Sequence, residues 1–467
     1  QKVRKLIKEK MSSQKAELGI VYGRRRVGKS TLLRALTKES RSLYFEGIKG
    51  LSSIEQVKHF CRQLADQTKT LPVLAYSWQD AFDALSAYVK NKKIYVVFDE
   101  FPWMANERQE LVGILKFYWD NNWKKNPKIT LVLCGSVAQF MVKHLIHSEA
   151  LHNRKTFEMK IFPLPCNEGA LFLKNKRSLF ETAQFLMAFG GIPKYLEQLE
   201  PKESLARNMD RLCFKKNSFF VNEFETLFKE QFKVIKTYEK IVKALSSSKL
   251  TKEELAKKIK TTTGGGLTTY LSNLEQAEFI RKEVSIDIEG KGEKTKTVKY
   301  VLSDEWLRFY FTYMASRLKT IEINTQNGLF EKITSSSIAN YWGISFENFC
   351  MKNIEVIFKA LDINSSEVLS WGPYFKQASR KHNAEGVQID IVILKKGNVV
   401  VVVECKFKEG AVGFSIVEEV QNKIKKIKIP TKITIEKVLI TANGVLPSVE
   451  REDYFNQILT LKDLLVI

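Results

Sequence analysis

The 467-residue sequence predicts an α/β fold that begins with a parallel sheet flanked by helices. The apolar run Leu18–Tyr22 is followed by a glycine-rich loop and then by a helical pattern at Thr31–Thr37. Two later apolar runs, Ile94–Glu100 and Ile129–Ser136, each end in polar residues. Continuous apolar runs of this length are typical of strands buried on both faces of a parallel sheet.

The glycine-rich loop Gly23–Thr31, GRRRVGKST, fits the phosphate-binding pattern G-x-x-x-x-G-K-[ST]. Its glycines let backbone N–H groups turn toward a phosphate at a helix N-terminus, where the macrodipole favours an anion. Lys29 is expected to reach the β- and γ-phosphates, and the Ser30 hydroxyl to hold Mg²⁺. The alternative is a chance Gly/Lys loop. We expect the following residues to bind ATP: Gly23, Arg24, Arg25, Arg26, Val27, Gly28, Lys29, Ser30 and Thr31.

Two of the buried strands end in candidate residues of the ATP site. Asp99 is expected to bind Mg²⁺ through water, and Glu100 to polarise the attacking water. A solvated acidic pair at a strand end is the alternative. Ser136 is expected beside the γ-phosphate, and it also fits a helix N-cap.

The charge and cysteine content of the chain indicate its class of binding partner and its cellular compartment. The net charge of +23 favours a polyanion, with nucleic acid first and an acidic membrane surface second. Six scattered cysteines without C-x-x-C spacing indicate reduced, buried thiols in a cytoplasmic protein. No apolar run approaches the ~18 residues of a membrane span, and no signal peptide is visible, so we expect no membrane association.

The chain resembles the archaeal-type P-loop ATPases of the AAA+/STAND group, which also occur in bacteria. The stretches that carry the resemblance are GRRRVGKS, FDEF at Phe98–Phe101, CGS at Cys134–Ser136 and GGIPKYL at Gly190–Leu196. The resemblance implies a five-stranded parallel sheet, a helical lid and an arginine near the γ-phosphate of its own or a neighbouring subunit. Arg154 is the nearest match, although Asn153 stands where the family usually has glycine. The entry motif Phe-x-x-Arg-Glu is absent, so the adenine contacts stay unassigned.

Residues 238–302 have the element order of a winged helix. Helices are expected at Tyr238–Leu245, Thr251–Lys260 and Leu267–Ala277, followed by extended segments at Phe279–Ile288 and Lys294–Leu302. The DNA-facing residues would be Thr268, Thr269, Ser272 and Asn273 on the third helix, with Lys291 and Lys294 on the wing. Winged helices also dock proteins, which is the alternative.

A second candidate site lies near the carboxyl end. Strands Val387–Leu394 and Val399–Phe407 flank the turn Lys396–Asn398. A three-residue turn pairs Lys395 with Val399 and thereby places Asp390 opposite Glu404, with Cβ atoms about 5 Å apart. A two-residue turn would pair Asp390 with Cys405 instead. Facing carboxylates predict a hard divalent metal.

Two further residues complete this constellation. Lys406 shares a strand face with Glu404, and Glu347 falls on the apolar face of a helix expected at Phe346–Ala360. The four residues resemble the PD-(D/E)xK nucleases, and by that resemblance Glu347, Asp390, Glu404 and Lys406 would be catalytic, with Mg²⁺ or Mn²⁺ on Asp390 and Glu404. An edge-strand charge, a helix ion pair and a solvated lysine are the alternatives.

The predicted organisation has four domains. They are a P-loop ATPase core at 1–165, a helical lid at 166–235, a winged helix at 236–303 and an α/β nuclease-like domain at 304–467. The predicted function is an Mg²⁺-ATPase that acts on DNA, with a homo-oligomer or partner protein as a further expectation. The alternatives are a nucleotide-gated regulatory or signalling protein that does not cleave, and a DNA-binding module with a degenerate ATP site.

Overall fold

The computed structural model describes residues 2–136, 140–173, 176–232, 234–288, 298–376, 386–427 and 429–466. The chain divides into two compact units, Gln1–Pro163 and Leu164–Ile467. Each unit has its own five-stranded sheet.

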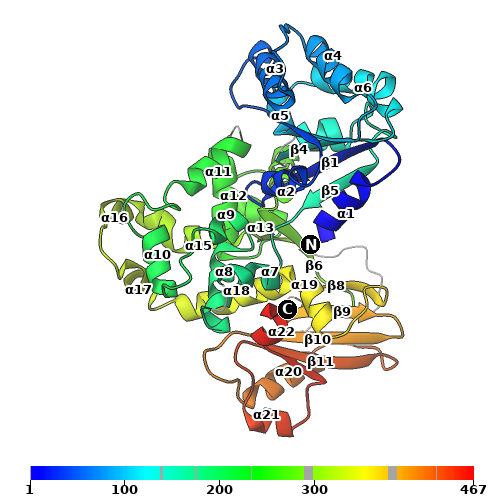
Figure 1. Ribbon diagram of the computed structural model, residues 1–467. Helices are drawn as coiled ribbons and strands as arrows, with labels where there is room; N and C mark the ends of the chain where they lie inside the picture. Colours follow the sequence, from blue (N-terminus) through cyan, green and yellow to red (C-terminus); the bar gives the residue numbers. More distant parts are fainter. Residues whose placement is uncertain are drawn as a thin grey trace. The chain divides into compact units, whose positions relative to one another are not determined.

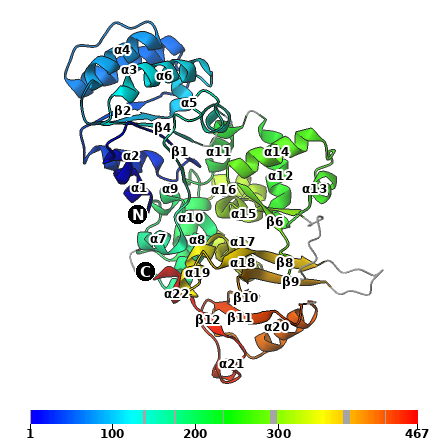
Figure 2. The ribbon, with the colours of Figure 1, turned by 90° about the vertical axis from the view of Figure 1, so that its right-hand side faces the viewer.

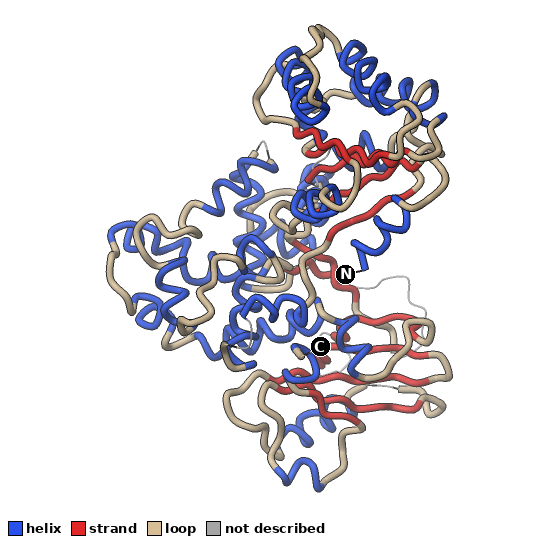
Figure 3. The backbone as a smooth tube through the Cα atoms, in the orientation of Figure 1, coloured by secondary structure: helices blue, strands red, loops and turns tan. Residues whose placement is uncertain are grey.

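The first unit is built on a parallel sheet (Figure 1). Its strand order is β2-β3-β4-β1-β5. Its amino-terminal helix and the helix after the glycine-rich loop cover one face, while the three longer helices α3, α4 and α6 cover the other (Figure 3). A cluster of buried aromatic rings lies beneath those three helices. The elements are α1 (Lys2–Met11), β1 (Glu17–Gly23), α2 (Lys29–Thr37), β2 (Ser42–Glu46), α3 (Ser53–Thr68), α4 (Trp78–Val89), β3 (Ile94–Asp99), α5 (Phe101–Met104), α6 (Glu110–Asn121), η1 (Trp123–Lys125), β4 (Ile129–Ser136), η2 (Met141–Ile146) and β5 (Phe157–Ile161).

This sheet confirms the α/β fold with a parallel central sheet that the apolar runs predict. Two of its interior strands, β3 and β4, are buried at every position. The strands end together, with Gly23 of β1 in register with Ser136 of β4. The polar residues that follow the strands are therefore gathered at one edge.

The second unit begins with helices and includes the GGIPKYL stretch. Its first elements are α7 (Cys166–Ala170), η3 (Leu171–Leu173), α8 (Leu179–Phe189), α9 (Pro193–Leu196), α10 (Leu205–Cys213) and α11 (Glu223–Gln231). Gly191 is required by close packing, because a Cβ atom there would lie 1.9 Å from the Leu164 carbonyl oxygen. The Tyr195 hydroxyl donates a hydrogen bond to Glu223 at 2.5 Å. The GGIPKYL stretch therefore contacts both Leu164, at the start of the unit, and Glu223 of α11.

The next elements follow the order of a winged helix (Figure 2). They are α12 (Ile235–Ser247), α13 (Lys252–Lys258), α14 (Gly265–Gln276) and the antiparallel pair β6 (Ile280–Val284) and β7 (Val298–Leu302). The capping box at Thr251 and Glu254 is present as expected. The first extended segment is shorter than expected, because beyond Val284 the chain leaves the hairpin and Ile286 bonds to the Pro373 carbonyl of β8.

The second sheet has the order β12-β11-β10-β9-β8, with antiparallel pairs on one side and parallel pairs on the other. Its strands are β8 (Val368–Lys376), β9 (Val387–Lys395), β10 (Val399–Lys406), β11 (Thr434–Thr441) and β12 (Gln457–Leu459). The remaining helices of the unit are α15 (Glu305–Phe309), η4 (Tyr310–Met314), η5 (Ala315–Arg317), α16 (Leu318–Ile323), α17 (Leu329–Thr334), α18 (Ile338–Lys352), α19 (Ile354–Ala360), α20 (Ser415–Lys425), α21 (Pro447–Arg451) and α22 (Leu461–Leu465).

The helix expected at Phe346–Ala360 is instead two helices that meet at Asn353. The Asn353 side chain accepts a hydrogen bond from the Cys166 backbone N–H at 2.7 Å and donates one to the Phe349 carbonyl. Asparagine competes with regular helical bonding through such side-chain bonds, which accounts for the break.

Residues that are far apart in the sequence pack together in the second unit. The Cys166 thiol, near its start, donates to the Leu464 carbonyl near its end. Asp210 accepts hydrogen bonds from the backbone N–H groups of Gly328 and Phe330. The predicted lid residues 166–235 thus belong to the same compact unit as the carboxyl-terminal sheet. The boundaries at 165, 235 and 303 stay predictions.

Candidate functional sites

The phosphate-binding loop connects β1 to α2 with a backbone that glycine makes possible. Gly28 has a φ of 87° at the N-cap of α2, a left-handed conformation that glycine adopts without steric cost. Arg26 is also left-handed, with a φ of 70°. These turns place the loop around the first backbone N–H groups of α2, where helix geometry favours an anion.

The side chains of the loop are held in different ways. Arg24 and Val27 are buried, and the Arg25 guanidinium lies over the Trp103 ring at 5.0 Å. Ser30 is half-buried and Thr31 is exposed.

Lys29 lies at the centre of the site. Its ammonium group donates hydrogen bonds to the carbonyl oxygens of Gly23 at 3.1 Å and Arg24 at 2.8 Å. It also lies 3.4 Å from the Ser136 hydroxyl, which brings these two predicted residues together. Burial lowers the pKa of Lys29, and the nearby Cys134, Glu100 and Asp99 partly offset this. The N-cap alternative for Ser136 depends on residues 137–139, which lie outside the described part of the chain.

Asp99 and Glu100 follow β3 at the same edge of the sheet. Asp99 is 1% exposed and accepts hydrogen bonds from the Tyr44 hydroxyl and, at 2.9 Å, from the Glu100 backbone N–H. Glu100 adopts a left-handed φ of 48° and begins the turn into α5. Burial and then the Asp99 charge raise the pKa of Glu100, as expected of a carboxyl group suited to proton transfer.

Tyr44 belongs to this site, although we did not predict it from the sequence. Its ring also lies beneath the Arg34 guanidinium at 4.1 Å. Burial and the neighbouring Asp99 raise its pKa strongly, so its hydroxyl stays protonated and acts as a donor. Side chains alternate between the two faces of a strand, and Leu43 and Phe45 are the buried residues of the strand SLYFE. This alternation was the signal in the sequence that Tyr44 lies on the opposite face of the sheet.

Arg154 is not placed beside the phosphate loop of its own chain. It precedes β5, whose Phe157 pairs with Gly19 near the start of β1, whereas the loop follows the end of β1. Four residues of strand, about 13 Å, separate Gly19 from Gly23. Both Arg154 Nε and Nη2 bond to Asp120 of α6 at 2.8 Å. This part of the prediction is corrected: in this unit Arg154 forms an ion pair at the amino-terminal edge of the sheet.

The carboxyl-terminal hairpin has the predicted register. Val399 pairs with Lys395 and Val403 with Ile391, so Asp390 lies opposite Glu404. Both carboxylates are buried, and Asp390 accepts a hydrogen bond from the Cys405 backbone N–H at 2.9 Å. The alternative register is therefore excluded.

The structure brings Glu347 close to this pair. Burial raises the pKa of Asp390 and the pKa of Glu404, and the charge of Glu347 raises that of Asp390 further. Burial also raises the pKa of Glu347. The positive charge of Lys249 lowers this pKa, and the negative charge of Glu404 raises it. Three mutually repelling carboxylates thus share one buried site.

Two lysines balance part of this charge. Lys406 lies 3.0 Å from Glu404 and 2.8 Å from Glu419. Lys423 of α20 lies 2.6 Å from Glu404 and 3.1 Å from Glu419. Lys423 and Glu419 were not predicted from the sequence, although their i,i+4 spacing on a helix after the strand was a usable signal.

The fit of a metal to this site is partial. Among the described residues, no group of three or more His, Cys, Asp or Glu side chains is arranged to hold a metal ion. Glu404 Oε2, however, is buried and has no hydrogen-bond partner among the described groups. An unpaired buried carboxylate oxygen is costly unless a cation or donor reaches it, so this atom is the point at which a cation would fit.

The helix predicted to read DNA is partly turned inward. Thr268 and Thr269 are exposed, and Thr268 accepts a hydrogen bond from Lys252. Ser272 and Asn273 are half-buried, and Asn273 donates to the Tyr238 hydroxyl at 2.7 Å. Asn273 therefore does not point outward as predicted. Lys291 and Lys294 lie outside the described residues.

The family comparisons define the class of the first unit. Residues 4–199 match a family model described as an ATPase domain predominantly from Archaea. Together with the parallel sheet and the loop around Lys29, this match identifies an ATPase-type domain at the amino-terminal end. Residues 310–426 match a model described as archaeal and bacterial proteins of unknown function.

Individual proteins are similar over most of the chain. An uncharacterized protein of Methanocaldococcus jannaschii, MJECL04, is 27% identical over 411 residues, which is 87% of this chain and 86% of that protein. The Walker-type ATPase PABY2304 of Pyrococcus abyssi is 18% identical, with a TM-score of 0.47 over 66% of this chain and 94% of that one. The ORC2 protein of Aeropyrum pernix, solved in ADPNP-ADP complexes, is 12% identical, with a TM-score of 0.44 over 69% of this chain and 92% of that one.

Two structural findings bear on the compartment and membrane predictions. All six cysteines are free and buried, as predicted. Within the described ranges, every helix is too short or too polar to cross a bilayer.

Proposed function

We propose that this protein is an Mg²⁺-dependent ATPase whose second unit binds DNA and carries a nuclease-like metal site. The observation that supports the ATPase part most is the convergence of Lys29, Ser136 and the Asp99–Glu100 pair at the carboxyl edge of the sheet. The match of residues 4–199 to an ATPase domain supports the same conclusion.

Each residue of the first site has a role in this proposal. Lys29 moves from the loop carbonyls to the terminal phosphates, and the backbone N–H groups at the start of α2 hold the same anion. Ser30 and Asp99 would hold Mg²⁺, which supplies charge neutralisation for the phosphates. Glu100 orients the attacking water and takes its proton.

Replacing Lys29 tests this proposal. Lys29→Ala is expected to lower ATP turnover by about a hundredfold or more, because a charge-stabilising donor is lost. Lys38→Ala removes an exposed charge just beyond the same helix and serves as the control. Turnover by Lys29→Ala equal to that of the control would contradict the assignment.

Three observations support the DNA and nuclease parts. The chain carries a net charge of +23, the second unit has the helix and hairpin order of a winged helix, and Asp390 faces Glu404. Asp390 and Glu404 would hold Mg²⁺ or Mn²⁺, which would polarise a phosphodiester. Glu347 and Lys406 would orient water beside it.

Cleavage of DNA by the purified full chain in Mg²⁺ or Mn²⁺ is the test. Asp390→Asn and Glu404→Gln are expected to abolish cleavage, whereas Glu450→Gln, on the exposed side of α21, is expected to retain it. If the two site variants cleave as fast as wild type, the activity belongs to a contaminant or another site.

The charge balance around Glu404 favours a second candidate, a nucleotide-gated regulatory or signalling protein that binds nucleic acid or protein without cleavage. Lys406 and Lys423 already neutralise this carboxylate. Salt-dependent DNA binding, with no cleavage in either metal, would favour this candidate. A DNA affinity that does not change with salt concentration would argue against contacts to the DNA phosphates.

The nucleotide is proposed to act on the second unit as a whole. Because residues 166–235 pack with the carboxyl-terminal residues, a movement of the predicted lid displaces the winged-helix and nuclease-like parts with it.

A second copy or a partner protein is a further proposed partner. The six buried free thiols fit a reducing, cytoplasmic setting.

A further inference from the structure

Lys423 of α20 is bound to a buried carboxylate of the carboxyl-terminal site. Its ammonium group donates to Glu404 Oε1 at 2.6 Å, and the Glu404 side chain is only 3% exposed. Burial by itself would lower the pKa of Lys423, but the negative charge of Glu404 outweighs that effect and raises it. The ammonium group therefore stays charged, and it lies on a carboxylate that is proposed to hold a metal ion.

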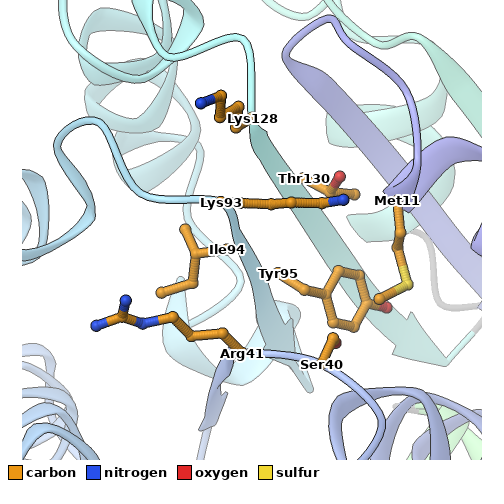
Figure 4. Close-up of a pocket in the computed structure, with 8 residues that line it drawn as sticks. All are labelled: Met11, Ser40, Arg41, Lys93, Ile94, Tyr95, Lys128 and Thr130. Carbon is orange, nitrogen blue, oxygen red and sulfur yellow. The ribbon is translucent and has the colours of Figure 1, made fainter.

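Cations in the first unit are placed differently. Arg41, Lys93 and Lys128 line a cavity of about 270 Å³ next to the starts of β2, β3 and β4 (Figure 4). All three residues are exposed, so water screens their charges. Lys423 is 24% exposed and its partner Glu404 is buried, so its charge acts on that carboxylate with much less screening.

Both lysines of the carboxyl-terminal site contact the same oxygen of Glu404. Lys406 Nζ lies 3.0 Å from Oε1, the atom that also accepts from Lys423. The other oxygen, Oε2, is buried and has no hydrogen-bond partner among the described groups. Two ammonium groups beside one carboxylate repel a further cation at that carboxylate, and little water is present to screen the repulsion. One lysine therefore has to move away before Glu404 can hold a metal ion tightly.

Lys423 is the lysine that is free to move. Lys406 lies on β10 two residues from Glu404, so the strand keeps both side chains on one face. Lys423 reaches the site from a separate helix through a long, flexible stem. Glu419, four residues earlier on the same helix, lies 3.1 Å from Lys423, and its side chain is 42% exposed. Lys423 thus keeps a solvated partner after it leaves Glu404.

We propose that Lys423 is a built-in competitor of the metal ion. It bridges Glu404 and Glu419 in the metal-free chain, and it gives up Glu404 but keeps Glu419 when a metal binds. This inference rests on the proposed metal site of Asp390 and Glu404. It also explains why, among the described residues, no three His, Cys, Asp or Glu side chains are arranged around one metal position, because Glu404 Oε1 is directed at the two lysines.

Calorimetric titration of the full, nucleotide-free chain with Mn²⁺ tests this competition, and Asp390→Asn identifies the heat that belongs to the site. Lys423→Met keeps a long apolar side chain and removes the charge. It is expected to bind Mn²⁺ about tenfold more tightly than the wild type, because a charge-assisted hydrogen bond no longer has to be broken. Lys423→Arg keeps a cation beside Glu404 and is expected to bind Mn²⁺ as weakly as the wild type.

Lys425→Met is the matched control. It removes one exposed positive charge from the same helix and is expected to change the Mn²⁺ affinity less than about twofold. Saturable binding that Lys423→Met does not tighten beyond this control would overturn the competition and leave the metal site standing. Absence of binding in both the wild type and Lys423→Met at millimolar Mn²⁺ would overturn the metal site together with the competition.

Lysine acetylation of the wild-type chain, measured by mass spectrometry, tests the same exchange without a substitution. At Mn²⁺ concentrations that saturate the site, Lys423 is expected to react several times faster than in a chelator, because it has lost its contact with the buried carboxylate. Lys425 is expected to react equally under both conditions. An equal rate for Lys423 with and without bound Mn²⁺ would refute the exchange.

Discussion

Replacing Asp390 by asparagine is expected to stabilise the second unit at alkaline pH in metal-free buffer. Burial and the Glu347 charge raise the pKa of Asp390 from 3.8 to about 6. At about 1.4 kcal/mol for each pKa unit, the ionised carboxylate costs the folded state about 3 kcal/mol. Asparagine removes that charge and keeps an oxygen that can accept from the Cys405 N–H.

The pH dependence follows from the same shift. The folded chain keeps the Asp390 proton at a higher pH than the unfolded chain does, so protonation favours folding. The free energy of unfolding of the wild type should therefore rise as the pH falls through about 6, and the gain is complete below 3.8. Asp390→Asn should have lost this part of the pH dependence.

Scanning calorimetry of the full chain in a chelator measures the effect. Asp390→Asn is expected to raise the unfolding temperature of the second unit by about 5 °C at alkaline pH, while the control Glu450→Gln leaves it nearly unchanged. With Mn²⁺ added, the wild type should gain stability and Asp390→Asn should not. If Asp390→Asn lowers the unfolding temperature in the chelator, the inference that the buried carboxylates repel one another and destabilise the folded state is refuted.

Two further predictions concern the first unit. Arg154→Ala should lower the free energy of unfolding by about 1 kcal/mol or less, as expected for a half-exposed ion pair. Denaturant unfolding of Arg154→Ala, Asp120→Ala and the double variant should show coupling, and additive losses would contradict the pair. Tyr44→Phe removes a donor to Asp99, so it should lower the Mg²⁺ concentration for half-maximal ATPase activity about fivefold, the effect of about 1 kcal/mol. A Mg²⁺ titration that superimposes on that of the wild type would exclude this role.

Much of the fold was predictable because local rules and burial agree. A strand buried on both faces is mostly apolar, and the apolar runs of β3 and β4 therefore predicted these strands from the sequence. The pairing of Asp390 with Glu404 was predictable because a three-residue turn leaves only one register for the strands beside it.

The remaining site residues depend on tertiary contacts that local patterns do not encode. Tyr44 contacts Asp99 from a neighbouring strand 55 residues away in sequence. Lys423 reaches Glu404 from α20, the helix that follows β10. The position of Arg154 was inferred from family resemblance alone, and its local pattern carries no information about the Asp120 partner on α6.

The contact between Cys166 and Leu464 has a consequence for biosynthesis. The two residues are 298 positions apart in the chain. At about 5–20 residues per second, a ribosome needs about 15–60 s to pass from one to the other. During that interval the helices near Cys166 lack α22, and their apolar surface is exposed to chaperones and to neighbouring nascent chains. The second unit is therefore expected to fold late, whereas the first has all of its strands once Ile161 has emerged.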